Sequence, residues 1–79
     1  MIKLKIMTLC SKALQAGRAI GWINGQFIKI IFSYEYGQFL VYVAGRLCHI
    51  GGNRLEVYYT VASITGSYRG WKKLHASAY

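Results

Sequence analysis

Residues 18–50 read RAIGWINGQFIKIIFSYEYGQFLVYVAGRLCHI, and this stretch decides the fold because short apolar runs alternate with turn residues. Asn24-Gly25 lies between two such runs, which is the strongest short-range signal for a β-hairpin. YEYG at residues 34–37 separates FIKIIFS from QFLVYV, and Ala44-Gly45 separates QFLVYV from RLCHI. Turn signals this close together predict an antiparallel meander.

The same pattern extends the predicted sheet beyond residue 50. Gly51-Gly52-Asn53 predicts another turn, and it leads into RLEVYYT at residues 54–60. In that run Leu55, Val57 and Tyr59 alternate with Arg54, Glu56 and Tyr58, a period of two that is typical of a strand. After Thr60 the period changes to three or four residues, which predicts a helix packed on the sheet. Its apolar stripe is Val61, Ile64, Tyr68, Trp71, Leu74 and Ala78.

The N-terminal residues carry two weaker patterns. Ile2, Leu4 and Ile6 alternate with lysines, which predicts a short strand. A short helix through residues 12–14 is also expected, begun by Thr8 and ended by Gly17. The whole chain is therefore predicted to be one α+β domain over residues 1–79. We expect an antiparallel meander of four to five strands, a C-terminal helix packed on one face, and a short N-terminal helix.

Charge is the clearest functional signal. The 79 residues include ten Lys and Arg but only two acids, Glu35 and Glu56, so the formal net charge is +8. Self-repulsion of this size is relieved by an anionic partner such as nucleic acid, a ribonucleoprotein, an acidic protein face or an anionic membrane. The chain is also 54% hydrophobic, which is too apolar for a disordered segment.

Several kinds of site are not expected. Cys10 and Cys48 form no metal-binding motif, so we expect no metal or cofactor; free thiols are the preferred interpretation, and a disulfide is left open. The most apolar region, residues 27–43, is interrupted by Lys29, Glu35 and Gln38, and is therefore not expected to span a membrane. The N-terminal apolar run is shorter than a signal peptide requires. We accordingly expect a cytoplasmic protein.

No catalytic residues are expected, because the chain has no aspartate and no recognisable nucleophile-and-base arrangement. His49 is the one residue with an alternative. On a predicted strand it would point away from the side of Cys48, toward solvent or RNA. There it could act as the acid–base group of an RNA-cleaving toxin, assisted by Arg46 and Arg54.

Basic residues interleaved with aromatic ones give the better candidate site. Basic side chains contact phosphates, and exposed rings stack on unpaired bases. The candidate binding residues are Lys29, Arg46, Arg54, Tyr58, Arg69, Lys72 and Lys73.

Two resemblances bear on function. Residues 37–74, with GQFLVYVAGRLCHI, RLEVYYT and VASITGSYRGWKKL in succession, look like the AP2-type module of plant factors and phage integrases. That resemblance implies a three-stranded sheet backed by one helix, with Arg46 and Arg54 reading a DNA groove.

The chain also resembles, in type, small proteins of phages and mobile elements, including anti-CRISPR proteins. These are compact single domains of sheet and helix without enzyme motifs. The resemblance implies a non-catalytic inhibitor that sterically blocks a nucleoprotein defence complex, such as a CRISPR effector, in the host cytoplasm. This is the leading hypothesis. A DNA- or RNA-binding module is second, an RNA-cleaving toxin third, and an anionic-membrane binder fourth.

Overall fold

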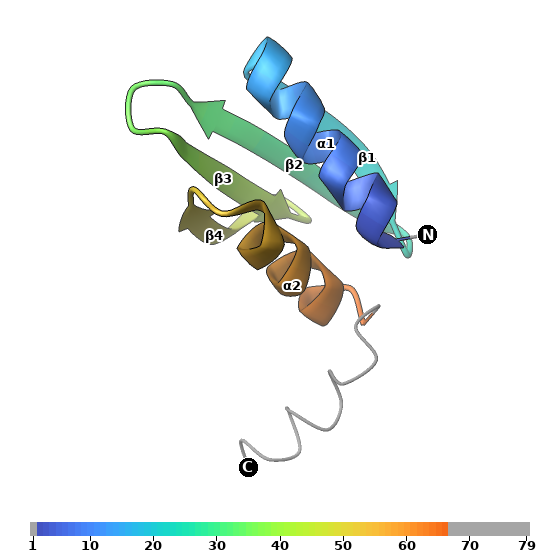
Figure 1. Ribbon diagram of the computed structural model, residues 1–79. Helices are drawn as coiled ribbons and strands as arrows, with labels where there is room; N and C mark the ends of the chain where they lie inside the picture. Colours follow the sequence, from blue (N-terminus) through green and yellow to red (C-terminus); the bar gives the residue numbers. More distant parts are fainter. Residues whose placement is uncertain (1, 67–79) are drawn as a thin grey trace.

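The computed structural model describes residues 2–66, which form a four-stranded sheet with two helices on one side (Figure 1). The elements are α1 (Ile2–Ala16), β1 (Arg18–Ile23), β2 (Gln26–Ser33), β3 (Gln38–Val43), β4 (Arg46–Gly51) and α2 (Arg54–Ile64). The strands lie side by side in chain order, and each neighbouring pair is antiparallel. The predicted α+β meander with a C-terminal helix on one face is therefore confirmed, with four strands.

The turns of the meander follow from local backbone chemistry. Asn24 and Gly25 have φ values of 50° and 77°, and Ala44 and Gly45 have 52° and 81°. Two successive positive φ values match the right-handed twist of the strands that such a turn joins. Residues 34–37 form the third connection, between β2 and β3. These three predicted turns are confirmed, whereas the fourth, Gly51-Gly52-Asn53, leads from β4 into the helix α2 instead of joining two strands.

The predicted N-terminal strand is wrong, because residues 2–6 are the first turns of the helix α1. The alternation over a few residues is overridden by a longer helical spacing, whose buried members are Ile6, Leu9, Cys10 and Ala13. Gly17 ends the helix as predicted. Its φ is +84°, and its N–H donates to the Ala13 carbonyl at 2.7 Å.

The predicted strand over residues 54–60 is also wrong, since α2 begins at Arg54 rather than at Thr60. The side chain of Asn53 caps this helix: its Oδ1 accepts a hydrogen bond from the Leu55 N–H at 2.8 Å. Val57 and Val61, one helical turn apart, are fully buried. Glu56 accordingly lies on a helix. The predicted continuation of this helix toward Ala78 lies outside the described residues.

The hydrophobic core lies between the sheet and the two helices. α1 packs on β1 and β2, and α2 packs on β3 and β4, with the two helices in contact. We call the sheet face beneath them the covered face. Its buried side chains are Ala19, Ile23, Ile28, Ile30, Phe39, Val41 and Val43. Because both helices pack on this face, the described residues leave the other face of the sheet bare (Figure 1).

Candidate functional site

The bare side of the sheet, which we call the open face, is the candidate site. Side chains alternate between the two faces of a strand, and directly opposed residues of neighbouring strands share a face. The strand register therefore assembles this face in rows. One row runs Ile20, Lys29, Tyr42, Leu47, and a second runs Arg18, Ile31, Leu40, Ile50. The pair Trp22 and Phe27 extends the face beside the first hairpin turn.

The open face is mostly aliphatic and aromatic. Trp22 is 60% exposed, Ile20 57%, Ile50 53% and Leu47 44%. Single exposed apolar residues are ordinary on protein surfaces, but a contiguous apolar patch marks an interaction site. Here four large apolar side chains from the two edge strands, β1 and β4, stand on one face, with half-buried apolar neighbours between them. The arrangement makes this face the candidate interaction surface.

Lys29 is the charged residue at the centre of the open face. Its Nζ lies 5.0 Å from the centroid of the Tyr42 ring, within range of a cation–π interaction. Trp22 and Phe27 meet edge to face with centroids 5.4 Å apart. The aromatic rings are thereby held in defined positions, with one cation among them.

The predicted basic-aromatic residues do not form one surface within the described part of the chain. Lys29 lies on the open face. Arg46, the first residue of β4, is exposed and lines a hollow with Cys48 and Ile64 at the end of α2. The predicted binding residues Arg69, Lys72 and Lys73 lie outside the described residues.

The other two predicted binding residues belong to the helical layer. Arg54 is exposed at the first position of α2. Tyr58 is half-buried against the core, with its ring 5.2 Å from that of Tyr59 and under the ammonium group of Lys3 at 5.6 Å. These residues therefore face away from Lys29, across the thickness of the domain.

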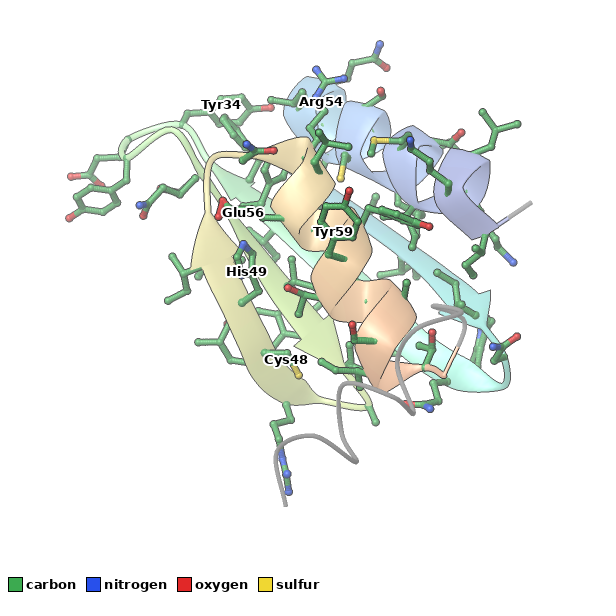
Figure 2. All side chains as sticks on the ribbon, turned by 60° about the horizontal axis from the view of Figure 1, so that its bottom comes forward. Tyr34, Cys48, His49, Arg54, Glu56 and Tyr59 are labelled. Atoms are coloured by element: carbon green, nitrogen blue, oxygen red, sulfur yellow. The ribbon has the colours of Figure 1, made fainter. Side chains whose placement is uncertain are left out.

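The expected orientation of His49 is wrong. The register between β3 and β4 shifts so that Tyr42 pairs with Leu47 and Val41 pairs with His49. The intervening Cys48 is the extra residue of a β-bulge, and its side chain packs against the core. His49 consequently turns to the covered face, together with Cys48, beneath α2 (Figure 2).

The surroundings of His49 are tight. Its Nε2 is buried without a hydrogen-bond partner and lies 2.9 Å from where a Cβ on Gly51 would stand. The Glu56 Oε2 lies 3.8 Å from the same point. A side chain at position 51 would require this imidazole to shift. The contacts make His49 part of the packing between β4 and α2, on the side of the sheet opposite the open face.

The two cysteines are free, and their environments differ. Cys48 is half-buried, and its Sγ lies 3.2 Å from the Arg46 carbonyl oxygen. Cys10 is fully buried, and this burial raises the pKa of its thiol from 9.0 to about 11, opposed by a smaller effect of the Arg54 charge. Cys10 is thus a protonated core side chain at neutral pH.

Among residues 2–66 there is no group of three or more His, Cys, Asp or Glu side chains that could hold a metal ion. Neither described helix is long and apolar enough to cross a membrane. Comparisons of the chain with protein-family models, with curated proteins and with solved structures find no match.

Most residues of the open face are not among the binding residues predicted from the sequence. Its signal is present in the strands: in RAIGWI and QFIKIIFS, apolar residues occupy both sets of alternating positions. Such strands are expected when both faces of a sheet are covered. A single layer of helices covers only one, so the second apolar set, with Ile20 and Trp22, points to a binding surface.

Proposed function

We propose that the protein is a non-catalytic inhibitor that docks its open face onto a protein subunit of an anionic nucleoprotein complex, of the CRISPR-effector kind. The observation that carries the proposal is a largely apolar sheet face that the described residues leave uncovered, in a chain of net charge +8. Burial of that face supplies affinity, and the charge directs encounter toward complexes that carry nucleic acid.

The composition of the open face favours a protein partner over nucleic acid. Nucleic-acid surfaces use cations to contact phosphates, whereas here each row holds one cation, Lys29 or Arg18, among mostly apolar neighbours. Aliphatic side chains such as Ile50 and Leu47 gain free energy by displacing water from another apolar surface. A large aromatic anchor is typical of protein interface hot spots, and Trp22 fits that role.

The test is inhibition of purified CRISPR effector complexes, measured as target cleavage across a panel of effector types. The wild-type protein is expected to inhibit at least one complex. The double variant Trp22→Ser/Ile50→Ser is expected to lose affinity for that complex at least tenfold, because it removes two exposed anchors. Leu55→Ser is the matched control, since Leu55 is 45% exposed on α2, away from the open face. Inhibition of no complex, or equal loss from both variants, contradicts the proposal.

A nucleic-acid-binding module remains the second candidate, on the observation that Trp22, Phe27 and Tyr42 present rings beside Lys29 on one sheet face. Rings on a sheet can stack on the bases of a single strand. Fluorescence anisotropy with labelled single-stranded RNA and DNA separates the two candidates. Binding at physiological salt that is lost in Tyr42→Ala favours this module. Binding that disappears as salt rises favours the protein-docking proposal.

A further inference from the structure

The outer edge of β1 is a second surface with its own chemistry. β1 is an edge strand of the sheet, hydrogen-bonded to β2 on one side. In the described residues no strand pairs with its other side. Edge strands of natural proteins are usually protected by charged residues, proline or a bulge. β4, the opposite edge, has a bulge at Cys48, whereas β1 pairs with β2 in unbroken register over its whole length.

The hairpin register identifies the free backbone groups. A two-residue turn is closed by a hydrogen-bonded pair, here Ile23 with Gln26, and such pairs then alternate along the ladder. The N–H and C=O groups of Ala19, Gly21 and Ile23 therefore point toward β2. Those of Arg18, Ile20 and Trp22 point outward from the sheet, so that β1 offers three donors and three acceptors in the spacing of a strand.

A groove runs alongside this edge, between α1 and β1. Its apolar side chains come from Leu4 and Leu9 of α1, while Gly21 and Ile20, whose side chain lies on the open face, line it from β1. Gly21 lets the helix approach closely, because a Cβ there would stand 3.3 Å from both Cδ atoms of Leu9. Lys5 and Lys12 line the same groove and are exposed. They are two helical turns apart, about 10.5 Å along the axis, with Leu9 between them.

The charged residues around the groove indicate which kind of partner it would bind. The segment from Ile2 to Ile23 contains Lys3, Lys5, Lys12 and Arg18 and no acidic residue. The two acids of the chain lie elsewhere, Glu35 in the loop between β2 and β3 and Glu56 in α2. A second copy of this chain would bring the same four cations to the edge, so pairing of two β1 strands is opposed by repulsion. An acidic strand is attracted.

We infer that the β1 edge binds an extended, acidic segment of a partner protein as a fifth strand of the sheet. Such a strand lies about 4.8 Å from β1, with alternate side chains over the groove. Helix-side positions two apart along it are about 6.7 Å apart, so an acid–apolar–acid pattern places two carboxylates about 13 Å from each other. The flexible side chains of Lys5 and Lys12 reach these carboxylates, while the apolar side chain between them packs on Leu9. This site does not depend on the docking of the open face.

The test uses the full chain and a blocked, fluorescein-labelled nine-residue peptide. Its three central helix-side positions are Glu, Leu and Glu, and its remaining positions are Val and Thr. Matched peptides carry Gln, or Lys, in place of Glu. We expect the Glu peptide to bind at least tenfold more tightly than the Gln peptide in anisotropy titrations. The largest amide chemical-shift changes in ¹⁵N spectra are expected at Arg18, Ile20 and Trp22.

The variant Lys5→Glu/Lys12→Glu is expected to weaken binding of the Glu peptide at least tenfold and to favour the Lys peptide. Lys3→Glu/Arg54→Glu is the control with the same change of net charge, because Lys3 faces Tyr58 rather than the groove. It is expected to change the affinity less than threefold. Lys5→Gln/Lys12→Gln serves if the double reversal does not fold.

Three results would overturn the inference. One is equal binding of the Glu and Gln peptides to the wild-type protein, and another is equal weakening by the groove variant and its control. The third is shift changes centred on β4, or on Lys29, Tyr42 and Leu40 of the open face, instead of the outward amides of β1. Because the shift map is made on the wild-type chain, it decides the question even if every groove variant fails to fold.

Discussion

Ile28 and Ile30 on the covered face are fully buried, whereas Ile20 and Ile50 on the open face are 57% and 53% exposed. All four are isoleucines in strands of one sheet. What separates them is the side of the sheet on which the two helices pack. Hydrophobicity therefore does not by itself determine burial in this domain: the helical layer buries one apolar face of the sheet, and within residues 2–66 the other face stays exposed.

The largest expected effect compares single deletions on the two faces. Ile30→Ala removes a fully buried side chain beneath the helices and should lower the free energy of unfolding by about 2–5 kcal/mol. Ile20→Ala on the open face should lower it by no more than about 0.5 kcal/mol. Urea denaturation measures both, with Ile30→Val as the milder variant if Ile30→Ala does not fold. Equal losses would mean that the open face is covered in the free protein.

The second expected effect tests burial on the covered face through pH. The thiol pKa of Cys10 is about 11 in the folded protein and has its ordinary value of 9.0 in the unfolded chain. Below pH 9 both states hold the proton, and between pH 9 and 11 only the folded state does. This group therefore destabilises the fold as pH rises through that window, by about 2–3 kcal/mol at completion. The stability of the wild-type protein relative to Cys10→Ala should fall accordingly. A constant difference from pH 7 to 11 would contradict the burial.

A smaller effect is expected from the helix that covers β3 and β4. Asn53→Ala removes the oxygen that caps α2 and should cost about 1 kcal/mol. Asn53→Asp keeps the acceptor and should retain the stability. Hydrogen exchange should accelerate at the start of α2 in the alanine variant while β1 and β2 amides keep their protection. Uniform acceleration throughout the domain would show that the two helices open together.

The smallest effect on stability is expected on the open face. Trp22→Thr should change the free energy of unfolding by less than about 0.5 kcal/mol, because Trp22 is 60% exposed. Binding of a hydrophobic fluorescent dye should decrease, since the variant breaks the apolar patch. Leu55→Thr on α2 provides the control, with dye binding close to that of the wild-type protein. A destabilisation of several kcal/mol would place Trp22 in a core.

Predictions from the sequence were confirmed where the backbone conformation depends on a few neighbouring residues. The turns at Asn24-Gly25 and Ala44-Gly45 need positive φ values over two residues. The glycine in each pair, preceded by Asn in the first, is a residue type that indicates such a turn. The predictions failed at residues 2–6 and 54–60, where a few alternating residues also fit one side of a helix. At both places the helical conformation is favoured because it buries residues such as Ile6 and Val57 against parts of the chain that are distant in sequence.

The candidate site was only partly predictable for the same reason. The sequence indicated a basic and aromatic binding protein, and Lys29 does lie at the centre of the open face. The side chains of Arg54 and Tyr58 were assigned to a strand, and the helical conformation of α2 carries them to the other layer. The bulge at Cys48 similarly turns the side chain of His49 to the covered face, because one extra residue in a strand changes the face on which the following side chain lies.

By itself the sequence determined the antiparallel meander, the positions of its turns and the strongly positive charge. These depend on residue types and on spacings within a few positions. Only the tertiary structure decided which of two apolar sheet faces is covered and which edge of the sheet adjoins the Lys5 and Lys12 groove. Both depend on where α1 and α2 pack, and that is set by the summed burial of side chains far apart in the chain.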